Sequence, residues 1–196
     1  GKALCEDGRV RKLSFTGSTP VGKVLYQQCA GTMKKLSLEL GGNAPFIVFD
    51  DADLEAAVDG AIASKYRNTG QTCVCANRLI VQAGIHDAFV ARLAEKVAAM
   101  KVGAGTGEGV TIGPLINDKA IAKVESLVRE AVADGAKIVV GGERHELGGL
   151  FYQPTVLTGA TPDMRLFQEE IFGPVAPIVK FETEAEAIEL ANATPF

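Results

Sequence analysis

The stretch KLSFTGSTPVGKVLYQQCA, residues 12–30, joins a strand pattern to a helix pattern through a glycine. Residues 12–17 predict a short strand. Residues 18–30 predict a helix, because Ser18 or Thr19 can cap it and Pro20 falls in its first turn. A strand that leads directly into a helix is typical of α/β folds.

The alternation of strands and helices continues along the chain. In residues 34–42 the leucines face one way and the polar residues the other, which predicts a strand that ends at Gly41-Gly42. Residues 44–49 predict a buried strand, and an amphipathic helix follows that ends near Gly70. The apolar face of that helix is formed by Leu54, Ala57, Val58, Ala61 and Ile62. Further strands are expected over 77–82, 136–141, 151–157 and 173–181, and helices over 87–101, 117–134 and 184–193.

Length and composition narrow the class of protein. With 196 residues and 47% hydrophobic content the chain can bury a core, and we expect one domain or one plus a piece of another. The net charge of -4 comes from interspersed acids and bases, which argues against a nucleic-acid surface. No apolar run approaches the ~18 residues that span a bilayer, and the first residues do not resemble a signal peptide. We expect a cytoplasmic protein with reduced thiols that binds a small molecule, and neither nucleic acid nor membrane.

Two of the four cysteines stand one residue apart in RNTGQTCVCANR, residues 67–78. Four cysteines so unevenly spread do not resemble a secreted disulfide framework. A structural zinc site needs a second pair of ligands, and neither His86 nor His145 has a partner at the required spacing. We therefore expect no metal site.

A disulfide between Cys73 and Cys75 is limited by geometry. In extended chain their Cα atoms would lie about 6.5 to 7 Å apart, at the outer limit for a disulfide. Such a bond would be strained and readily reduced, which suits a reversible switch. The other interpretation makes one of them a nucleophile, either with a histidine as in hydrolases or through a thioester that needs no histidine.

Two further places could carry chemistry. In FTGSTPVG, residues 15–22, a glycine turn meets a helix N-terminus, which can bind a phosphate, although an ordinary capped helix is the commoner case. Glu39 precedes two glycines at the end of a leucine-rich strand. Its carboxylate could be a general base or simply a solvated strand residue.

Four motifs together resemble a known family. ELGG at 39–42, GQTC at 70–73 and EEIFGPV at 169–175 stand in the order found in the NAD(P)-dependent aldehyde dehydrogenases, and FTGSTPVG resembles the phosphate-binding turn of that family. The resemblance runs through essentially the whole chain. It implies the aldehyde-dehydrogenase catalytic domain, an α/β fold with a mostly parallel sheet flanked by helices.

The resemblance also implies roles for individual residues. Cys73 matches the nucleophile that forms a thiohemiacetal and then a thioester, and its backbone N–H matches half of the oxyanion hole. Glu39 matches the base that activates water to hydrolyse the thioester. The cofactor would be NAD or NADP, and the positions that match its binding residues are Gly17 and Ser18 for the pyrophosphate, Leu40 and Gly41 beside the nicotinamide, and Glu170 and Phe172 for its ribose and ring.

The surroundings of Cys73 resemble the succinate-semialdehyde dehydrogenases, which are sometimes grouped with the glutarate-semialdehyde enzymes. Arg67 lies six residues before Cys73, and a guanidinium can hold the far carboxylate of a semialdehyde through two parallel hydrogen bonds. The alternative for Arg67 is a cation that complements a helix C-terminus. The same resemblance suggests Cys75 as a redox partner of Cys73.

Compared with the family pattern, the chain is expected to be a fragment. Residues 1–40 would be the C-terminal piece of the nucleotide-binding domain, and residues 41–196 the catalytic domain, truncated before its oligomerisation segment. We expect the parent protein to be a homodimer or homotetramer and the fragment alone to be nearly inactive. A non-catalytic thiol redox module and an enzyme that acylates coenzyme A are the alternatives. Glu39 argues against both, because neither needs a base for hydrolysis.

Overall fold

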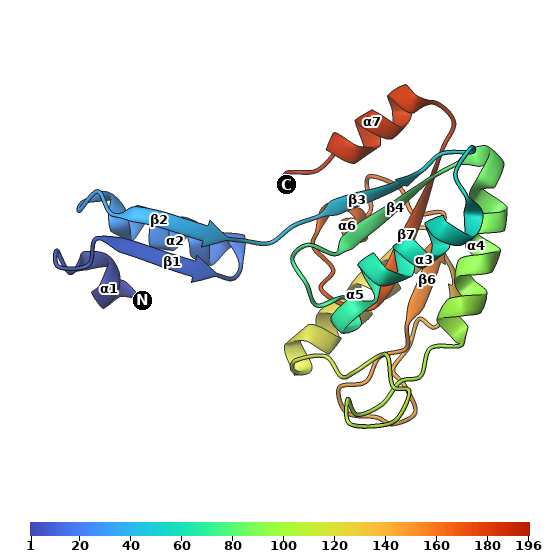
Figure 1. The fold of residues 1–196 in the computed structure, drawn as a ribbon, viewed down its shortest axis with the longest axis horizontal. Helices are drawn as coiled ribbons and strands as arrows, with labels where there is room; N and C mark the ends of the chain where they lie inside the picture. Colours follow the sequence, from blue (N-terminus) through green and yellow to red (C-terminus); the bar gives the residue numbers. More distant parts are fainter. The chain divides into compact units, whose positions relative to one another are not determined.

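The computed structural model describes residues 1–196 and consists of two compact units, Gly1–Gly41 and Gly42–Phe196 (Figure 1). The division falls one residue after the boundary expected from the sequence. The roles assigned to the two parts, nucleotide binding and catalysis, stay predictions. None of the helices combines the length and the apolar composition that crossing a membrane requires.

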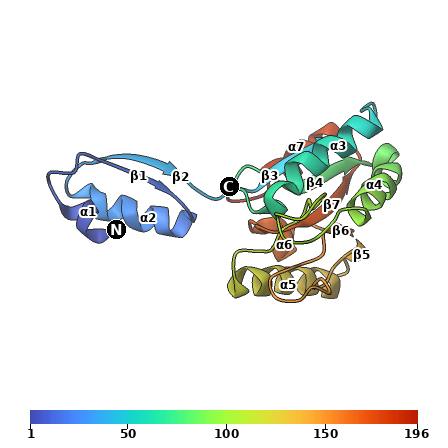
Figure 2. The same cartoon turned by 60° about the horizontal axis from the view of Figure 1, so that its bottom comes forward.

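The first unit is a β-α-β arrangement preceded by a short helix. Its elements are α1 (Lys2–Glu6), β1 (Lys12–Thr16), α2 (Thr19–Ala30) and β2 (Lys35–Glu39). The two strands are parallel and in register from Lys12 opposite Lys35 to Thr16 opposite Glu39. Both helices cover the same face of the strands (Figure 2), where half-buried strand residues pack on Cys5, Leu25 and Cys29.

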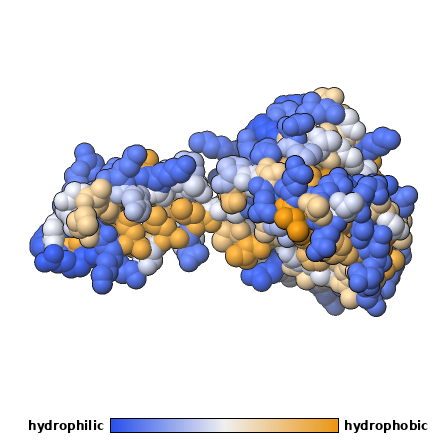
Figure 3. Space-filling view, turned by 90° about the horizontal axis from the view of Figure 1, so that it is seen from above, coloured by the Kyte–Doolittle hydropathy of each residue, from blue (hydrophilic) through white to orange (hydrophobic).

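Apolar side chains also remain on the surface of the first unit (Figure 3). The large exposed ones are Leu4, Val21, Val24, Tyr26 and Met33. Side chains alternate along both strands of this unit. The strand leucines and Phe15 face the helices, and the polar strand residues face the other side. The alternation predicted for residues 34–42 is therefore confirmed for β2.

The second unit contains a five-stranded sheet in the order β3-β4-β7-β6-β5. The strands are β3 (Ala44–Val48), β4 (Ala76–Gln82), β5 (Lys137–Val140), β6 (Thr155–Thr158) and β7 (Val175–Phe181). All neighbours are parallel except the edge pair of β5 and β6. The expected α/β fold with a mostly parallel sheet is confirmed.

Helices cover both faces of this sheet. They are α3 (Leu54–Lys65), the 3-10 turn η1 (Arg67–Gly70), α4 (Ala83–Ala98), α5 (Asp118–Ala133), α6 (Arg165–Gln168) and α7 (Glu184–Asn192). One core lies between the sheet and α3 with α4, and the other between the sheet and α5 with α7. Asp53, Asn117 and Thr183 cap α3, α5 and α7, and the side chain of each accepts the backbone N–H of the third residue of its helix.

The prediction of a buried strand over 44–49 was wrong. β3 forms one edge of the sheet, and Ile47 is 37% exposed. Pro45 has no N–H to donate, and such a residue is tolerated at an edge. A short apolar run looks alike in sequence whether one or two neighbours cover the strand. The helix predicted to end near Gly70 also ends earlier, at Lys65, and η1 then leads to Gly70.

Candidate active site

Cys73 lies in a turn between η1 and β4. The N–H of Cys75 donates to the carbonyl of Thr72 at 3.2 Å, so the two cysteines are not in extended chain as the strained-disulfide geometry assumed. All four cysteines are free. The thiol of Cys73 is partly exposed, whereas Cys75 is buried and its Sγ lies 3.5 Å from the carbonyl oxygen of Gly70. The turn thus gives the two neighbouring thiols different environments.

Strained backbone leads into this turn. Asn68 and Thr69 have φ of 52° and 59°, a left-handed conformation that is unusual for a β-branched residue such as Thr69. The Thr69 hydroxyl compensates by accepting the N–H of Gly113 at 2.9 Å, and Gln71 accepts the N–H of Ile116 at 2.9 Å. Strain held by surrounding contacts is common at functional sites. The sequence did not reveal this bracing, because its partners lie more than forty residues away.

Gly42 links the nucleophile turn to the EEIFGPV segment. A Cβ at residue 42 would lie 2.5 Å from the carbonyl oxygen of Cys73, so only glycine fits there without a shift. The N–H of Gly42 donates to Oε1 of Glu170 at 3.2 Å. The resemblance implies a role for Gly41 and none for Gly42. The glycine pair Gly41-Gly42 indicates that another group can approach the backbone closely. It does not indicate that this group is the carbonyl of Cys73.

The EEIFGPV segment is held by the buried Asn77 and the partly buried Lys123. Asn77, on β4, donates to the carbonyl of Glu169 at 2.9 Å and accepts the N–H of Ile171 at 3.0 Å. Lys123 donates to the carbonyl of Glu170 at 2.6 Å. Phe172 has a φ of 55°, and the two motifs approach closely where Gly70 meets the carbonyl of Gly173. The structure therefore brings Cys73, Glu170 and Phe172 onto two adjoining segments.

Arg67 begins η1 and is exposed. Its guanidinium takes part in none of the ion pairs or side-chain hydrogen bonds of the fold, whereas Arg92, Arg144 and Arg165 each pair with a carboxylate. Arg67 therefore has no carboxylate partner within the unit. An unpaired guanidinium is available to an anionic ligand.

The remaining candidate residues belong to the first unit. Gly17 follows β1, its N–H donates to the carbonyl of Glu39 at 3.0 Å, and a side chain at this position would meet the ring of Phe15. Ser18 is the N-cap of α2 and makes no side-chain capping bond. The carboxylate of Glu39 is exposed, and Leu40 packs on Gly22. The side-chain cap that the sequence predicted at the start of α2 is thus absent at Ser18, and this helix begins directly after the glycine turn.

Lys65 lies at the end of α3 with its side chain fully buried, and its Nζ is the one buried side-chain nitrogen or oxygen without a hydrogen-bond partner. Burial lowers the pKa of Lys65 to about 8, and the charges of Cys75 and Glu170 oppose this shift. Lys65 is not among the residues predicted from the sequence. Its spacing was a signal, because residue 65 follows Ala61 and Val58 by four and seven positions on the buried face of α3.

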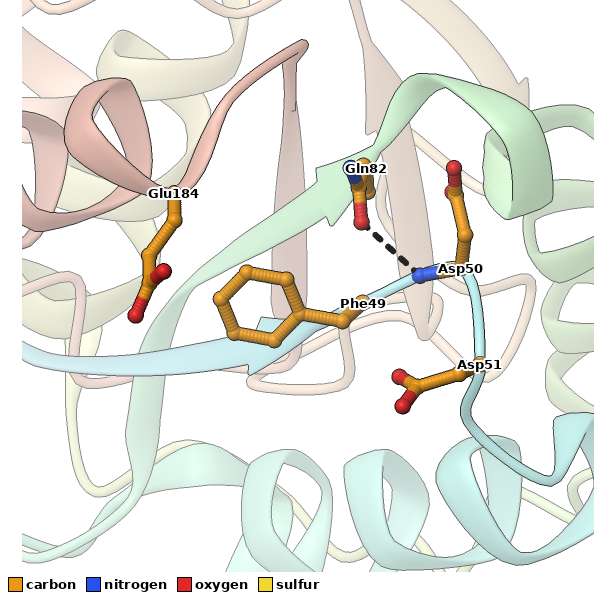
Figure 4. A pocket seen from close by; sticks show the side chains of 5 residues that line it. All are labelled: Phe49, Asp50, Asp51, Gln82 and Glu184. Atoms are coloured by element: carbon orange, nitrogen blue, oxygen red, sulfur yellow. Dashed lines mark hydrogen bonds between the residues drawn. The ribbon is translucent and has the colours of Figure 1, made fainter.

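A surface pocket of about 380 Å³ lies elsewhere, where β3 and β4 end. Its lining residues are Phe49, Asp50, Asp51, Gln82 and Glu184 (Figure 4). Asp50 has a structural task there, since it accepts the N–H of Ile85 at 3.1 Å in the first turn of α4. No residue of the four motifs lines this pocket, so it is not the candidate active site.

A model of the aldehyde dehydrogenase family matches residues 1–196, and the chain belongs to that family. It is 56% identical over its whole length to the succinate-semialdehyde dehydrogenase [NADP(+)] of Escherichia coli and to the glutarate-semialdehyde dehydrogenase of Pseudomonas aeruginosa, covering 41% of each. It is 56% identical to the 3-sulfolactaldehyde dehydrogenase of Pseudomonas putida, covering 40%.

A crystal structure of succinate-semialdehyde dehydrogenase from Burkholderia pseudomallei superposes on the whole chain with a TM-score of 0.98 at 59% identity, covering 40% of that protein. The chain therefore spans about two fifths of the length of the relatives that it matches. The resemblance to the aldehyde dehydrogenases is confirmed.

Proposed function

We propose that the protein containing this chain oxidises succinate semialdehyde to succinate with NAD or NADP. The observation that carries the proposal is the turn at Cys73, where a partly exposed thiol follows strained, braced backbone and adjoins the segment of Glu170. The reduced thiol acts as nucleophile at the aldehyde carbon, which gives a thiohemiacetal on Cys73. Oxidation converts this adduct into a thioester, and hydrolysis releases the acid.

Residues of the chain serve each of these steps. The N–H of Cys73 is engaged by no backbone carbonyl, so it can donate to the oxygen that becomes negatively charged during attack. Glu39 removes a proton from the water that hydrolyses the thioester, and its exposed carboxylate has no competing ion pair. The bracing by Gln71 and Thr69 fixes the position of the thiol.

The donors of the chain fit NAD or NADP. By the resemblance, Gly17 and Ser18 at the start of α2 would hold the pyrophosphate, Leu40 and Gly41 would contact the nicotinamide, and Glu170 and Phe172 would hold its ribose and ring. When bound, the nicotinamide supplies the acceptor for the hydride that leaves the aldehyde carbon. Glu170 is held by Gly42 through Oε1, which leaves Oε2 for ribose hydroxyls.

Arg67 supports an aldehyde with an anionic group as the substrate. The names of three relatives describe aldehydes that carry one anionic group in addition to the aldehyde, a carboxylate in succinate and glutarate semialdehyde and a sulfonate in 3-sulfolactaldehyde. The exposed and unpaired guanidinium of Arg67 suits such a group, because it offers two parallel donors. Glutarate semialdehyde is the alternative substrate, and a thiol redox module without turnover is the alternative function.

A substrate panel on the full-length protein tests the proposal. Four- and five-carbon semialdehydes and butanal are each assayed with NAD and with NADP, and the highest kcat/KM is expected for succinate semialdehyde. A Glu39→Gln variant should release about one equivalent of reduced cofactor per site and then stall, because the thioester is not hydrolysed. Absence of turnover with every aldehyde, while Cys73 still reacts with iodoacetamide, would favour the redox module.

Three further expectations belong to the proposal. The parent protein is a homodimer or homotetramer, which light scattering of the full-length protein tests. It works in a reducing compartment such as the cytoplasm, because oxidation consumes a thiol nucleophile. The 196 residues alone turn over little or nothing, since they match only 41% of the length of the succinate-semialdehyde dehydrogenase of Escherichia coli.

A further inference from the structure

Two buried amides lie side by side where β3 and β4 begin. Asn43, directly before β3, is 4% exposed, and Asn77 on β4 is 1% exposed. The pairing of the two strands is irregular here, because Pro45 pairs with Arg78, two residues beyond the partner of Ala44. Asn77 is thereby the extra residue of β4, and an extra residue of this kind redirects the side chain that it carries.

Backbone partners fix the orientation of both amides. Nδ2 of Asn43 donates to the carbonyl of Phe167 at 2.9 Å, and its Oδ1 accepts from Nδ2 of Asn77 at 2.6 Å. Asn77 also donates to the carbonyl of Glu169 at 2.9 Å and accepts the N–H of Ile171 at 3.0 Å. A carbonyl can only accept and a backbone N–H can only donate, so neither amide can be turned over without losing its bonds. A buried network that is fully satisfied specifies one arrangement.

The network holds Glu170 from both sides. Asn77 binds the carbonyl before it and the N–H after it, and the N–H of Gly42 donates to its Oε1 at 3.2 Å. Gly42 is followed directly by Asn43, so the donor to the carboxylate and the amide that reaches Asn77 belong to one short segment. Arg78 fixes this segment, since its Nε and Nη2 donate to the carbonyl of Asn43 at 3.1 and 2.7 Å. The backbone and the carboxylate of Glu170 are therefore held by the same segment.

We propose that Asn43 is a positioning residue that acts through Asn77 on Glu170, and that this amide pair sets the affinity for the cofactor. The inference rests on the proposed function, because it takes the cofactor contact of Glu170 as given. A carboxylate that is already held at one oxygen and at the backbone on both sides loses little further freedom when ribose hydroxyls bind to it. Without the amide pair the segment around Glu170 can shift relative to Gly42, and ordering it again opposes binding.

Equilibrium binding tests the role of Asn43 without relying on turnover. Nicotinamide fluorescence measures the Kd of NADH and of NADPH for the full-length protein. Asn43→Ala should raise both Kd values about tenfold, the order expected when a hydrogen bond to a charged group is weakened. Gln82→Ala is the matched control. Gln82 lies at the other end of β4, and its amide likewise joins two segments by accepting the N–H of Asp50 and donating to the carbonyl of Glu182. This variant should leave both Kd values unchanged.

A double-mutant cycle tests whether Asn43 acts through Glu170. Glu170→Ala should itself weaken cofactor binding. Adding Asn43→Ala to it should raise the Kd by less than about twofold more, because the carboxylate that Asn43 positions is gone. If the two effects were independent, the full loss caused by Asn43→Ala would recur in the Glu170→Ala background, and this result would overturn the proposal.

The same exchange at the two amides should have different results. Asn43→Asp keeps the oxygen that accepts from Asn77 and loses only the donor to Phe167. The guanidinium of Arg78, which bonds only to carbonyl groups, favours the added negative charge, so this variant should keep a Kd close to the native value. Asn77→Asp places an oxygen against Oδ1 of Asn43 and the carbonyl of Glu169, so it should bind at least as weakly as Asn43→Ala.

The outcomes separate the role of Asn43 from the proposed function. If Asn43→Ala binds both cofactors as the native protein does, or if Asn43→Asp binds as weakly as Asn77→Asp, the role of Asn43 is overturned. The comparison of the two aspartate variants also decides the case if Asn43→Ala does not fold. If the native protein binds neither NADH nor NADPH, or if Glu170→Ala binds as tightly as the native protein, the proposed cofactor contact is wrong and the inference falls with it.

Discussion

Gly42 passes directly against the carbonyl of Cys73, and a Cβ at residue 42 would stand 2.5 Å from that oxygen. The same glycine donates its N–H to Glu170. The end of ELGG thereby joins the nucleophile turn to the segment that is proposed to hold the cofactor. Adding a single methyl group at residue 42 should therefore disturb both the turn at Cys73 and the position of Glu170.

Gly42→Ala should lower activity strongly, because either the turn at Cys73 or the Glu170 contact must move. The free energy of unfolding should fall by about 1 to 3 kcal/mol, as is typical of overpacking. Urea unfolding and the rate of Cys73 alkylation by iodoacetamide measure the two effects. Gly105→Ala is the control, because nothing lies within 4 Å of a Cβ at that position. Native alkylation and activity in Gly42→Ala would show that the contact is unimportant.

Asn77→Ala should destabilise the second unit and displace Glu170. Asn77 is buried, and its loss leaves the carbonyl of Glu169 and the N–H of Ile171 without partners. We expect a loss of about 2 to 5 kcal/mol in the free energy of unfolding together with weaker cofactor binding. Asn192→Ala removes an exposed amide on α7 and should change stability by less than about 0.5 kcal/mol.

Arg67→Ala should raise the KM for succinate semialdehyde about 10- to 100-fold and leave the KM for butanal unchanged. The reason is that only the semialdehyde has a carboxylate for the guanidinium to bind. Arg67→Lys should restore the affinity in part, since an ammonium cannot make two parallel hydrogen bonds. Steady-state kinetics with both aldehydes measure the difference. An equal effect on both substrates would assign Arg67 to the fold.

Cys75 should protect Cys73 from irreversible oxidation. Hydrogen peroxide converts the thiol of Cys73 to a sulfenic acid with release of water, and the thiol of Cys75 then condenses with it to a disulfide and a second water. The native protein should recover activity with dithiothreitol after peroxide treatment, and Cys75→Ala should not. Equal and irreversible loss in both proteins would contradict a protective role.

Lys65 should make stability depend on pH in an unusual direction. Its pKa is lowered from 10.5 in the unfolded chain to about 8 in the fold, so the unfolded chain binds more protons between these values. The contribution of Lys65 therefore opposes folding below pH 8 and disappears as the pH rises toward 10.5. The shift corresponds to roughly 3 kcal/mol. Urea unfolding at pH 7 and pH 10 should show that Lys65→Met is stabilised mainly at the lower pH.

A large part of the fold could be predicted from local sequence. The glycine turn between β1 and α2, the alternation in β2 and the helical spacing after residue 53 each depend on neighbours within a few positions. The errors have a common physical origin. β3 was predicted to be buried because its apolar run does not reveal that it lacks a neighbour on one side.

The α/β class, the family and the candidate nucleophile Cys73 could be predicted from the sequence, since these depend on local periodicity and on motifs in order. Only the tertiary structure showed that Cys73 and Cys75 occupy a turn with different exposure, that Gly42 joins Cys73 to Glu170, and that Lys65 is buried without a partner. The physical reason is that hydrogen bonding, close approach and desolvation depend on residues that are far apart in sequence. For Gly42 and Glu170 that separation is 128 residues, and no local pattern records it.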